Sequence, residues 1–318
     1  MKTLKKLRLI LTILSLVSFI TPVNAEVKVV TSIKPLHSLA SYLMDGVGKP
    51  DLIVDGYASP HGFSMKPSHA KMLQDADLIF WVGEDLENFL EKPLNSIAKK
   101  AEKIELMDIK GLNVLSFRER NIFDEHDDHD DHEGHTKKKK DEHDDHEGHG
   151  HGEYDPHIWL DPINAKVILK EMTEHLIEND SKNASTYKSN LDKALKDIDK
   201  LTMNVMTELN QSVSSIVFHD AYQYFEKRFD VNIIGALTVN TDVLPGAEQI
   251  VEIREVIEHE KVTCVLSEPQ FNPDIVKTIA NDTNINMGVL DPLGAKLDKG
   301  KTLYFNLIGN ISSSLKNC

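Results

Sequence analysis

The chain has 318 residues, of which 27% are charged and 40% hydrophobic, and its formal net charge is -15 at pH 7. So acidic a chain is a poor partner for nucleic acid or an anionic membrane surface, because both would repel it. Its length allows two lobes of ordinary size, each able to bury a core of its own.

The first 25 residues have the pattern of a secretory signal peptide. Four basic residues precede the apolar run Leu9–Ile20, and Val23-Asn24-Ala25 precedes Glu26. The apolar run is shorter than the roughly 20 residues that span a bilayer, and Pro22 follows it. We therefore expect cleavage after Ala25, no remaining membrane anchor, and a mature protein in the periplasm if the source has two membranes.

Short apolar runs rich in β-branched residues recur in both halves of the mature chain and predict strands. They are Val27–Thr31, Leu52–Val54, Leu78–Val82, Ile216–Phe218, Ile233–Leu237, Val262–Leu266 and Met287–Leu290. Segments of helical periodicity separate these runs. The alternation predicts two α/β lobes with parallel sheets.

Between the two groups of strands, residues 164–213 carry apolar side chains at a spacing of three or four, with charges between them. No strand fits this pattern, so we predict one long helix, with a break allowed at residues 180–183. We expect an N-terminal lobe over residues 26–163, this linking helix over 164–213, and a C-terminal lobe over 214–318. Such a helix would restrict hinge motion between the lobes.

Residues 124–153 differ from both lobes. They contain eight of the 15 histidines, 13 acidic residues and four consecutive lysines, in an imperfect repeat whose copies begin DEHDDH. With almost no apolar residue to bury, this histidine-rich tract cannot offset the entropy of ordering. We predict a disordered surface insertion in the N-terminal lobe.

The composition of the histidine-rich tract favours metal binding, because imidazole suits zinc, copper and nickel and carboxylate adds anionic oxygen ligands. A solvated charge run is the alternative interpretation, but solubility does not require histidine. We interpret the tract as a collector of metal ions that binds weakly, because each site must be ordered as it forms. Its histidines are His126, His129, His132, His135, His143, His146, His149 and His151.

A tight site must be sought among the other histidines, of which three have unusual settings. His61 lies in a turn-rich loop directly after the Leu52–Val54 strand, where open α/β sheets place ligands. His157 lies between two Asp-Pro pairs, whose carboxylates are close enough to orient an imidazole, and His219 ends the Ile216–Phe218 strand. Each signal alone is weak, since a lone histidine at a strand end more often packs or forms a hydrogen bond.

The remaining histidines have ordinary settings. His175 falls within the long helix among polar neighbours, His259 lies in a charged stretch, and His69 opens a predicted helix after Pro67. We interpret these three as background. The sequence does not decide the role of His37, which lies near the first strand.

Six motifs, in order along nearly the whole mature chain, resemble the ZnuA family of zinc-uptake solute-binding proteins. They are GYASPHGF (56–63), DLIFWVG (77–83), DPHIWLDP (155–162), FHDAYQYF (218–225), EPQF (268–271) and LDPLG (290–294). The resemblance implies two (β/α)4 lobes joined by a long helix, with zinc in the interlobe cleft. It also implies delivery of Zn²⁺ to the membrane permease of a zinc ABC transporter, and we expect a monomer.

Carried over position by position, His61, His157 and His219 match the metal-binding histidines of that family. Some zinc members have Glu immediately before the first histidine, where this chain has Pro60. Asp291, a water molecule or a histidine of the tract is therefore left to complete a tetrahedron. Related manganese binders commonly offer a carboxylate at the position of His219, whereas three imidazoles favour zinc on ligand softness.

Two other functions compete with zinc delivery. A metallohydrolase also offers three protein ligands and an open position, but no H-E-x-x-H motif is present and no general base stands out beside the ligands. We therefore predict that the protein is not an enzyme. A periplasmic zinc buffer or chaperone without an importer is left open by the sequence.

The two cysteines, Cys264 and Cys318, are zinc ligands, free thiols or a disulfide. An oxidising compartment and an even count favour pairing, and the paired spacing that thiolate sites usually show is absent. The resemblance points the same way, because ZnuA members can carry a cysteine before the Glu-Pro-Gln motif and another near the C-terminus. A bond that closes so long a loop contributes about 4 kcal/mol in the chain-entropy model.

Overall fold

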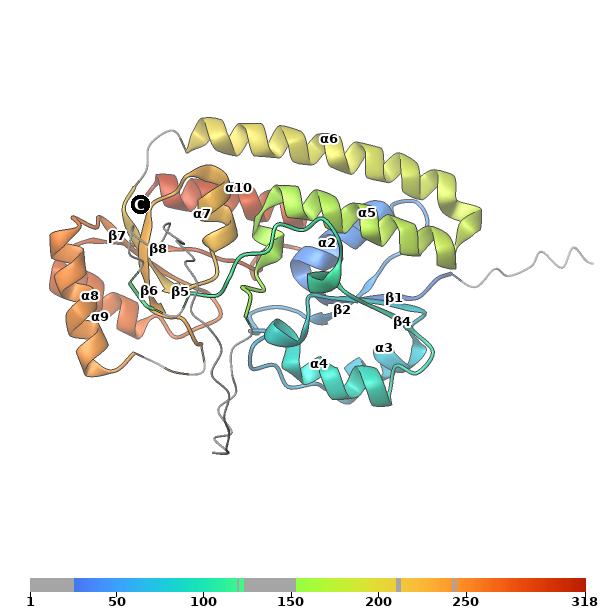
Figure 1. Cartoon of the computed structure of the whole chain (residues 1–318), viewed down its shortest axis with the longest axis horizontal. Coiled ribbons are helices and arrows are strands. Elements are labelled where there is room, and N and C mark those ends of the chain that lie inside the picture. Colours follow the sequence, from blue (N-terminus) through green and yellow to red (C-terminus); the bar gives the residue numbers. More distant parts are fainter. Residues whose placement is uncertain (1–25, 119, 123–152, 210–212, 242, 244) are drawn as a thin grey trace, which may run out of the picture.

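The computed structural model describes residues 26–118, 120–122, 153–209, 213–241, 243 and 245–318. The predicted signal peptide, and the histidine-rich tract except Glu153, lie outside these residues. The described residues form two α/β lobes that lie side by side, the N-terminal one on the right and the C-terminal one on the left of Figure 1. No described helix has the length and apolar character that a membrane crossing requires.

A parallel four-stranded sheet in the order β2-β1-β3-β4 forms the N-terminal lobe. The central strands β1 and β3 are buried at every position, as expected for a parallel sheet covered on both faces. The elements of this lobe are β1 (Val29–Ile33), α2 (Lys34–Leu43), β2 (Asp51–Val54), α3 (Pro67–Asp75), β3 (Leu78–Trp81), α4 (Glu84–Ser96), β4 (Glu102–Glu105) and η1 (Leu106–Asp108).

The C-terminal lobe repeats this arrangement, with a parallel sheet in the order β6-β5-β7-β8. Its elements are β5 (Ser215–His219), α7 (Gln223–Phe229), β6 (Ile233–Thr238), α8 (Ala247–His259), β7 (Cys264–Ser267), α9 (Asp274–Thr283), β8 (Asn286–Val289) and α10 (Leu303–Lys316). The two sheets confirm the predicted fold class, and each of the seven predicted strands overlaps an observed one.

Strand β4 was not predicted. It lies at the edge of its sheet, and of its four residues only Ile104 is buried. An edge strand exposes most of its surface, so its sequence, Glu-Lys-Ile-Glu, lacks the apolar run that identified the other strands.

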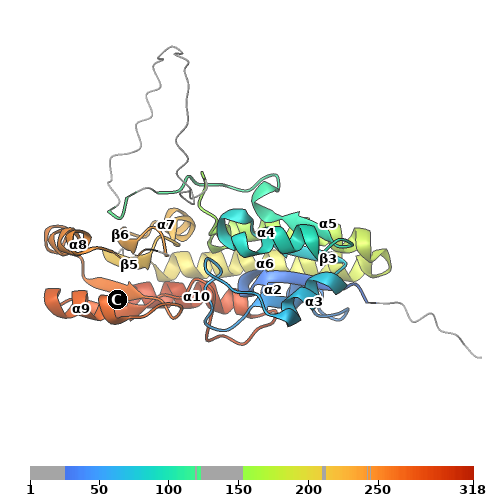
Figure 2. The same cartoon turned by 90° about the horizontal axis from the view of Figure 1, so that it is seen from below.

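The linking region contains two helices and not one. Helix α5 (Pro162–Asn179) and helix α6 (Ala184–Glu208) are separated by the short η3 (Ser181–Asn183), at the position where a break was allowed. The Asp180 carboxylate accepts hydrogen bonds from Asn183 Nδ2 (2.6 Å) and Tyr187 Oη (2.8 Å), which stabilise the turn. Helix α5 folds back along α6, and only α6 extends along both lobes (Figures 1 and 2).

The larger of two hydrophobic clusters runs through both lobes. It contains Val29 and Phe80 of the N-terminal lobe together with Val217 and Leu266 of the C-terminal lobe. Helix α10 contributes to it by packing against α2 and α6. A second apolar cluster lies within the C-terminal lobe, where Ile253 of α8 and Ile279 of α9 take part.

Cys264 and Cys318 form a disulfide, with their Cα atoms 5.5 Å apart. The bond joins the chain end that follows α10 to strand β7, and it confirms the predicted pairing. Both sulfur atoms are therefore removed from the set of available zinc ligands.

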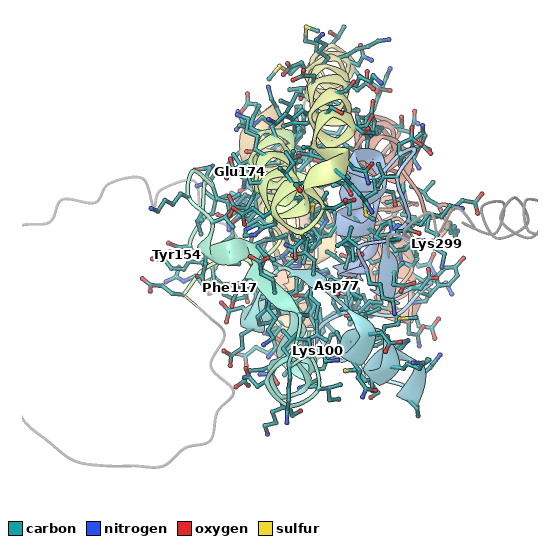
Figure 3. The ribbon with its side chains drawn as sticks, turned by 90° about the vertical axis from the view of Figure 1, so that its right-hand side faces the viewer. Asp77, Lys100, Phe117, Tyr154, Glu174 and Lys299 are labelled. Atoms are coloured by element: carbon teal, nitrogen blue, oxygen red, sulfur yellow. A yellow bond between two sulfur atoms is a disulfide. The ribbon has the colours of Figure 1, made fainter. Side chains whose placement is uncertain are left out.

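The segment before the histidine-rich tract crosses to the C-terminal lobe. There the Ala236 backbone N–H donates to the Asn121 carbonyl at 2.8 Å. The chain emerging from the tract lies beside the same segment, because the Phe117 N–H donates to the Glu153 carbonyl at 3.1 Å. Figure 3 shows Phe117 and Tyr154 close together here. Phe117, seven residues before the tract, and Glu153, its last residue, therefore lie side by side.

Candidate metal centre

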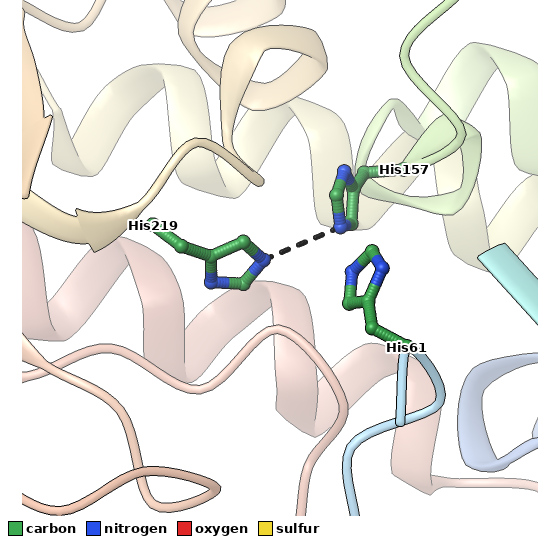
Figure 4. A group of neighbouring side chains, drawn as sticks. All are labelled: His61, His157 and His219. Carbon is green, nitrogen blue, oxygen red and sulfur yellow. Dashed lines mark hydrogen bonds between the residues drawn. The ribbon is translucent and has the colours of Figure 1, made fainter. Parts of the chain in front are cut away.

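Three histidines from distant parts of the sequence come together between the lobes. His61 lies in the loop after β2, His157 directly precedes η2 (Ile158–Leu160), and His219 is the last residue of β5. Pairing of His219 with Thr238 of β6 places it at the carboxyl end of the C-terminal sheet. Figure 4 shows the three imidazoles directed toward one another.

The spacing of the imidazole nitrogens suits one metal ion. His157 Nε2 and His219 Nε2 are 3.4 Å apart, and the ligand nitrogens of all three histidines lie within 4.8 Å of one another. Ligand atoms of a tetrahedral zinc ion lie about 3.3 Å apart, because each bond is about 2.0 Å long. His61 is partly exposed, whereas His157 and His219 are buried.

A carboxylate holds each of the two buried imidazoles. His157 Nδ1 lies 2.7 Å from Asp155 Oδ1, and His219 Nδ1 lies 2.7 Å from Glu268 Oε1. An ionised carboxylate only accepts hydrogen bonds, so each Nδ1 donates and each Nε2 carries the lone pair. With both rings neutral, two lone pairs face each other across 3.4 Å, and a proton on His219 Nε2 makes the same contact a hydrogen bond. This carboxylate–histidine arrangement is the one that orients zinc ligands and strengthens their basicity.

Burial sets the electrostatics of the site. Burial lowers the pKa of His157 well below its usual value, and the nearby His219 lowers it further. Burial also lowers the pKa of His219, but Glu268 and the carboxylates of Asp220 and Asp155 outweigh it, so this pKa is raised.

The nearby carboxyl groups respond to burial in the opposite direction. Burial raises the pKa of Asp155 to about 7, although the His157 N–H and the Arg118 guanidinium oppose this rise. The pKa of Asp220 is likewise raised to about 7 by burial, against the effect of Arg118. A divalent cation held by the imidazoles would lower the pKa of both carboxyl groups, against the effect of burial. It would thereby favour their ionised forms.

The space between the imidazoles is small. The cavity that they line has a volume of about 10 Å³, which is roughly what one water-sized particle occupies. Its other walls come from both lobes and include Trp159, Phe271 and Leu293. The space between the imidazoles therefore has room for a single ion.

Asp291, the predicted possible fourth ligand, is directed elsewhere. Its carboxylate accepts hydrogen bonds from Gln270 Nε2 (3.0 Å) and from three backbone N–H groups. Those groups belong to Leu293, Gly294 and Ala295. Asp291 is absent from the group of described residues that contains the three histidines. A water molecule or a histidine of the tract is left for a fourth position, and the tract histidines lie outside the described residues.

The other histidines are placed away from this centre. His37 Nε2 contacts the Pro50 carbonyl at 3.2 Å, and His69 Nδ1 accepts from the Lys66 N–H at the start of α3. His259 is exposed beside Glu260, and His175 lies among carboxylates near the end of α5.

Glu268 is the residue whose role the sequence did not reveal. It was noted only as part of the EPQF motif, 49 positions after His219. It directly follows β7, the neighbour of β5 in the sheet, so its place at the strand end was the available signal.

The family described as "ZnuA: Zinc-uptake complex component A periplasmic" matches residues 29–318. A high-affinity zinc uptake system protein ZnuA from Brucella abortus (strain 2308) is 46% identical over 303 residues, covering 91% of each chain. A crystal structure of ZnuA matches with a TM-score of 0.72 at 20% identity, covering 91% of this chain and 99% of that one.

A Mn-bound periplasmic metal binding protein from candidatus liberibacter asiaticus has a similar structure, with a TM-score of 0.71 at 18% identity. The match covers 91% of this chain and 98% of that one. At such identities the two structural matches establish a shared fold.

Proposed function

The chain belongs to the periplasmic zinc-uptake component A family, and on this premise we propose that it captures Zn²⁺ outside the cytoplasmic membrane and passes it to the permease of an ABC importer. The ion is cargo. We further propose that the mature protein begins after Ala25, resides in the periplasm and acts as a monomer.

The proposal that His61, His157 and His219 bind the ion is carried by one observation. The buried Nε2 atoms of His157 and His219 face each other at 3.4 Å with carboxylates behind both rings. Two imidazole lone pairs repel at this distance unless a cation or a proton lies between them. The lowered pKa of His157 disfavours a proton on its Nε2, whereas the raised pKa of His219 lets a proton occupy this position until a metal ion displaces it.

Zinc is the metal that this ligand set favours. Three neutral imidazoles are borderline-soft ligands, whereas Mn²⁺ prefers carboxylate and carbonyl oxygen. The one carboxylate considered as a direct ligand, Asp291, is engaged with backbone N–H groups. Manganese should therefore bind this centre more weakly than zinc.

We also propose that the centre binds and releases the ion without catalysing a reaction. A zinc hydrolase needs a general base and room for a substrate beside the metal-bound water. Here Asp155 Oδ1 and Glu268 Oε1 are hydrogen-bonded to imidazoles, and the cavity is about 10 Å³. Neither group is free to activate water in this arrangement.

Zinc uptake by cells tests the proposal and separates delivery from buffering. Cells that lack the chain are supplied with the wild type, His219→Ala or the control His259→Ala, and uptake of labelled zinc at limiting concentration is measured. We expect the wild type and the control to restore uptake and His219→Ala to fail. Binding in vitro together with no effect of the wild type on uptake would instead establish a buffer.

A further inference from the structure

A second group of potential metal ligands lies on the N-terminal lobe. Glu102 of β4 meets His175 and Glu178 of α5, and their ligand atoms all lie within 4.8 Å of one another. His175 is 13 residues beyond Pro162, the first residue of α5, which places it about 20 Å along that helix. Figure 3 looks onto this end of the lobe, with the neighbouring Glu174 labelled.

Both ring nitrogens of His175 face carboxylates. Nε2 lies 3.3 Å from Glu171 Oε1 and forms a hydrogen bond with it. Nδ1 lies 2.7 Å from Glu102 Oε1 and 3.9 Å from Glu178 Oε2. Nδ1 is itself inaccessible to solvent, yet its contact with Glu102 lacks the direction of a hydrogen bond. The Nδ1 lone pair and the two carboxylate oxygens therefore surround a position that is suited to a cation.

The arrangement has the parts of a zinc site. Glu171 fixes the tautomer that leaves Nδ1 as the ligand, which is the task that carboxylates perform behind zinc-bound histidines. His175 Nδ1 is 2.7 Å from Glu102 Oε1 and 3.9 Å from Glu178 Oε2. These distances lie on either side of the spacing of about 3.3 Å between two ligand atoms of a tetrahedral zinc ion. Asn179 Nδ2 donates to Glu102 Oε2 at 2.8 Å, so the Glu102 carboxylate is already oriented.

The surroundings carry an excess of negative charge. A hollow of about 880 Å³ adjoins the group, and its lining has six carboxylates, Glu84, Glu91, Glu102, Glu105, Asp108 and Glu171, against two lysines, Lys103 and Lys110. Burial raises the pKa of Glu105, and neighbouring carboxylates, Asp108 foremost, raise it further. A divalent cation bound at the edge of this hollow would relieve this repulsion.

We propose that Glu102, His175 and Glu178 form a second zinc site, with Glu171 as the residue that positions His175. The site offers one partly exposed imidazole and two exposed carboxylates, so water completes the coordination. It should therefore bind more weakly than three imidazoles with buried carboxylates behind them. A zinc ion there joins β4, the edge strand of the sheet, to α5. The site shares no residue with the cleft and does not depend on the proposed transport function.

The competing interpretation is a proton on Nδ1, which would make His175 an imidazolium paired with its carboxylates. Locating zinc directly distinguishes the two. Crystals of the mature chain grown with Zn²⁺ alone are measured on both sides of the zinc absorption edge. We expect an anomalous peak between Glu102, His175 and Glu178, and none beside His259, whose Nδ1 has only the adjacent Glu260 at 2.8 Å.

Solution measurements supply the second half of the test. Native mass spectrometry at saturating Zn²⁺ should count one zinc fewer in His175→Gln than in the wild type or in His259→Gln. Glu178→Gln, at a side chain that is 69% exposed, should weaken this site at least about tenfold. Equal zinc counts in all four proteins, or peaks of equal height at His175 and His259, would overturn the proposal.

Discussion

His157 Nε2 and His219 Nε2 lie 3.4 Å apart although 62 positions separate the two residues in the sequence. One belongs to the loop that follows the histidine-rich tract, and the other ends a strand of the C-terminal lobe. Their approach exists only in the folded chain. Zinc that binds at this centre therefore also stabilises the folded chain. Each residue of the site can be tested by replacing it.

The three imidazoles should contribute to one tight site. Replacing His61, His157 or His219 with Ala should weaken zinc binding more than about 100-fold. Loss of a residue that only orients a metal ligand weakens binding by up to about 100-fold, and loss of the ligand itself should weaken it more. Affinity is measured by competition with a chelator of known strength. His259→Ala, at an exposed histidine, is the control and should leave the affinity unchanged. Wild-type affinity in all three variants would place the site elsewhere.

The carboxylates behind the imidazoles should matter less than the imidazoles themselves. Glu268→Gln removes the negative charge behind His219 Nδ1 while keeping the side-chain shape, and we expect zinc affinity to fall about 10- to 100-fold. Asp155→Asn should act similarly through His157. Calorimetric zinc titration checks both. An affinity equal to that of the wild type in the two variants would contradict an orienting role.

Removal of residues 124–152 should eliminate several weak zinc sites and leave the tight one. The tract directly precedes the segment of His157, and its last residue, Glu153, contacts Phe117, so metal bound to it should stay at high effective concentration near the centre. Native mass spectrometry counts the bound ions, and chelator competition gives the tight affinity. Loss of tight binding in the deletion would instead make a tract histidine an obligatory ligand.

Glu87 should make stability depend on pH. Burial raises its pKa from 4.5 to about 7, against hydrogen bonds to Glu87 Oε2 from the backbone N–H groups of Val82 (2.8 Å) and Gly83 (3.1 Å). Between these values the unfolded chain has lost a proton that the folded chain keeps, so stability falls as pH rises from 4.5 to 7. Glu87→Gln imitates the protonated form and should lack this fall.

Denaturation of that variant at several pH values measures the difference. Above pH 7 the free energy of unfolding of Glu87→Gln should exceed that of the wild type by about 1–3 kcal/mol, and the gain should vanish near pH 4.5. Glu84→Gln, at an exposed position of the same helix, should show no such pH-dependent gain. A variant destabilised equally at every pH would refute this role for Glu87.

The Cys264–Cys318 bond should stabilise the fold without affecting zinc. It closes a loop of 54 residues, and its removal by the double replacement Cys264→Ala and Cys318→Ser should cost up to about 4 kcal/mol. Urea denaturation measures the loss. Zinc affinity should be unchanged, because neither sulfur contacts the centre; a weaker affinity would show coupling between them.

The three histidines could be selected from the sequence partly because two of them lie at or just after the end of a predicted strand. Strand β2 precedes the loop of His61 and strand β5 ends at His219, and apolar runs identified both strands. The carboxyl ends of parallel strands lie at one edge of the sheet, and ligand-binding residues are commonly found at that edge. The resemblance to a family was needed to select these histidines, since each setting alone is weak.

Other features depended on contacts that no local pattern encodes. From the sequence alone, Asp291 was a reasonable metal ligand. In the structure, three backbone N–H groups of the following turn donate hydrogen bonds to its carboxylate. His175 had only polar neighbours in the sequence, and the residue that completes its group is Glu102. Glu102 lies on β4, the strand that the sequence did not reveal, so the group could not be foreseen.

The shared core changes how the molecule responds to heat. Val29 and Leu266 belong to one apolar cluster although they lie in different lobes, and α10 packs on α2 across the boundary. Structures whose lobes have separate cores can melt in separate steps, whereas a common core makes unfolding cooperative. The two lobes should therefore lose their structure in a single calorimetric transition. A zinc ion bound between them should move that whole transition upward in temperature, because it binds only the folded chain.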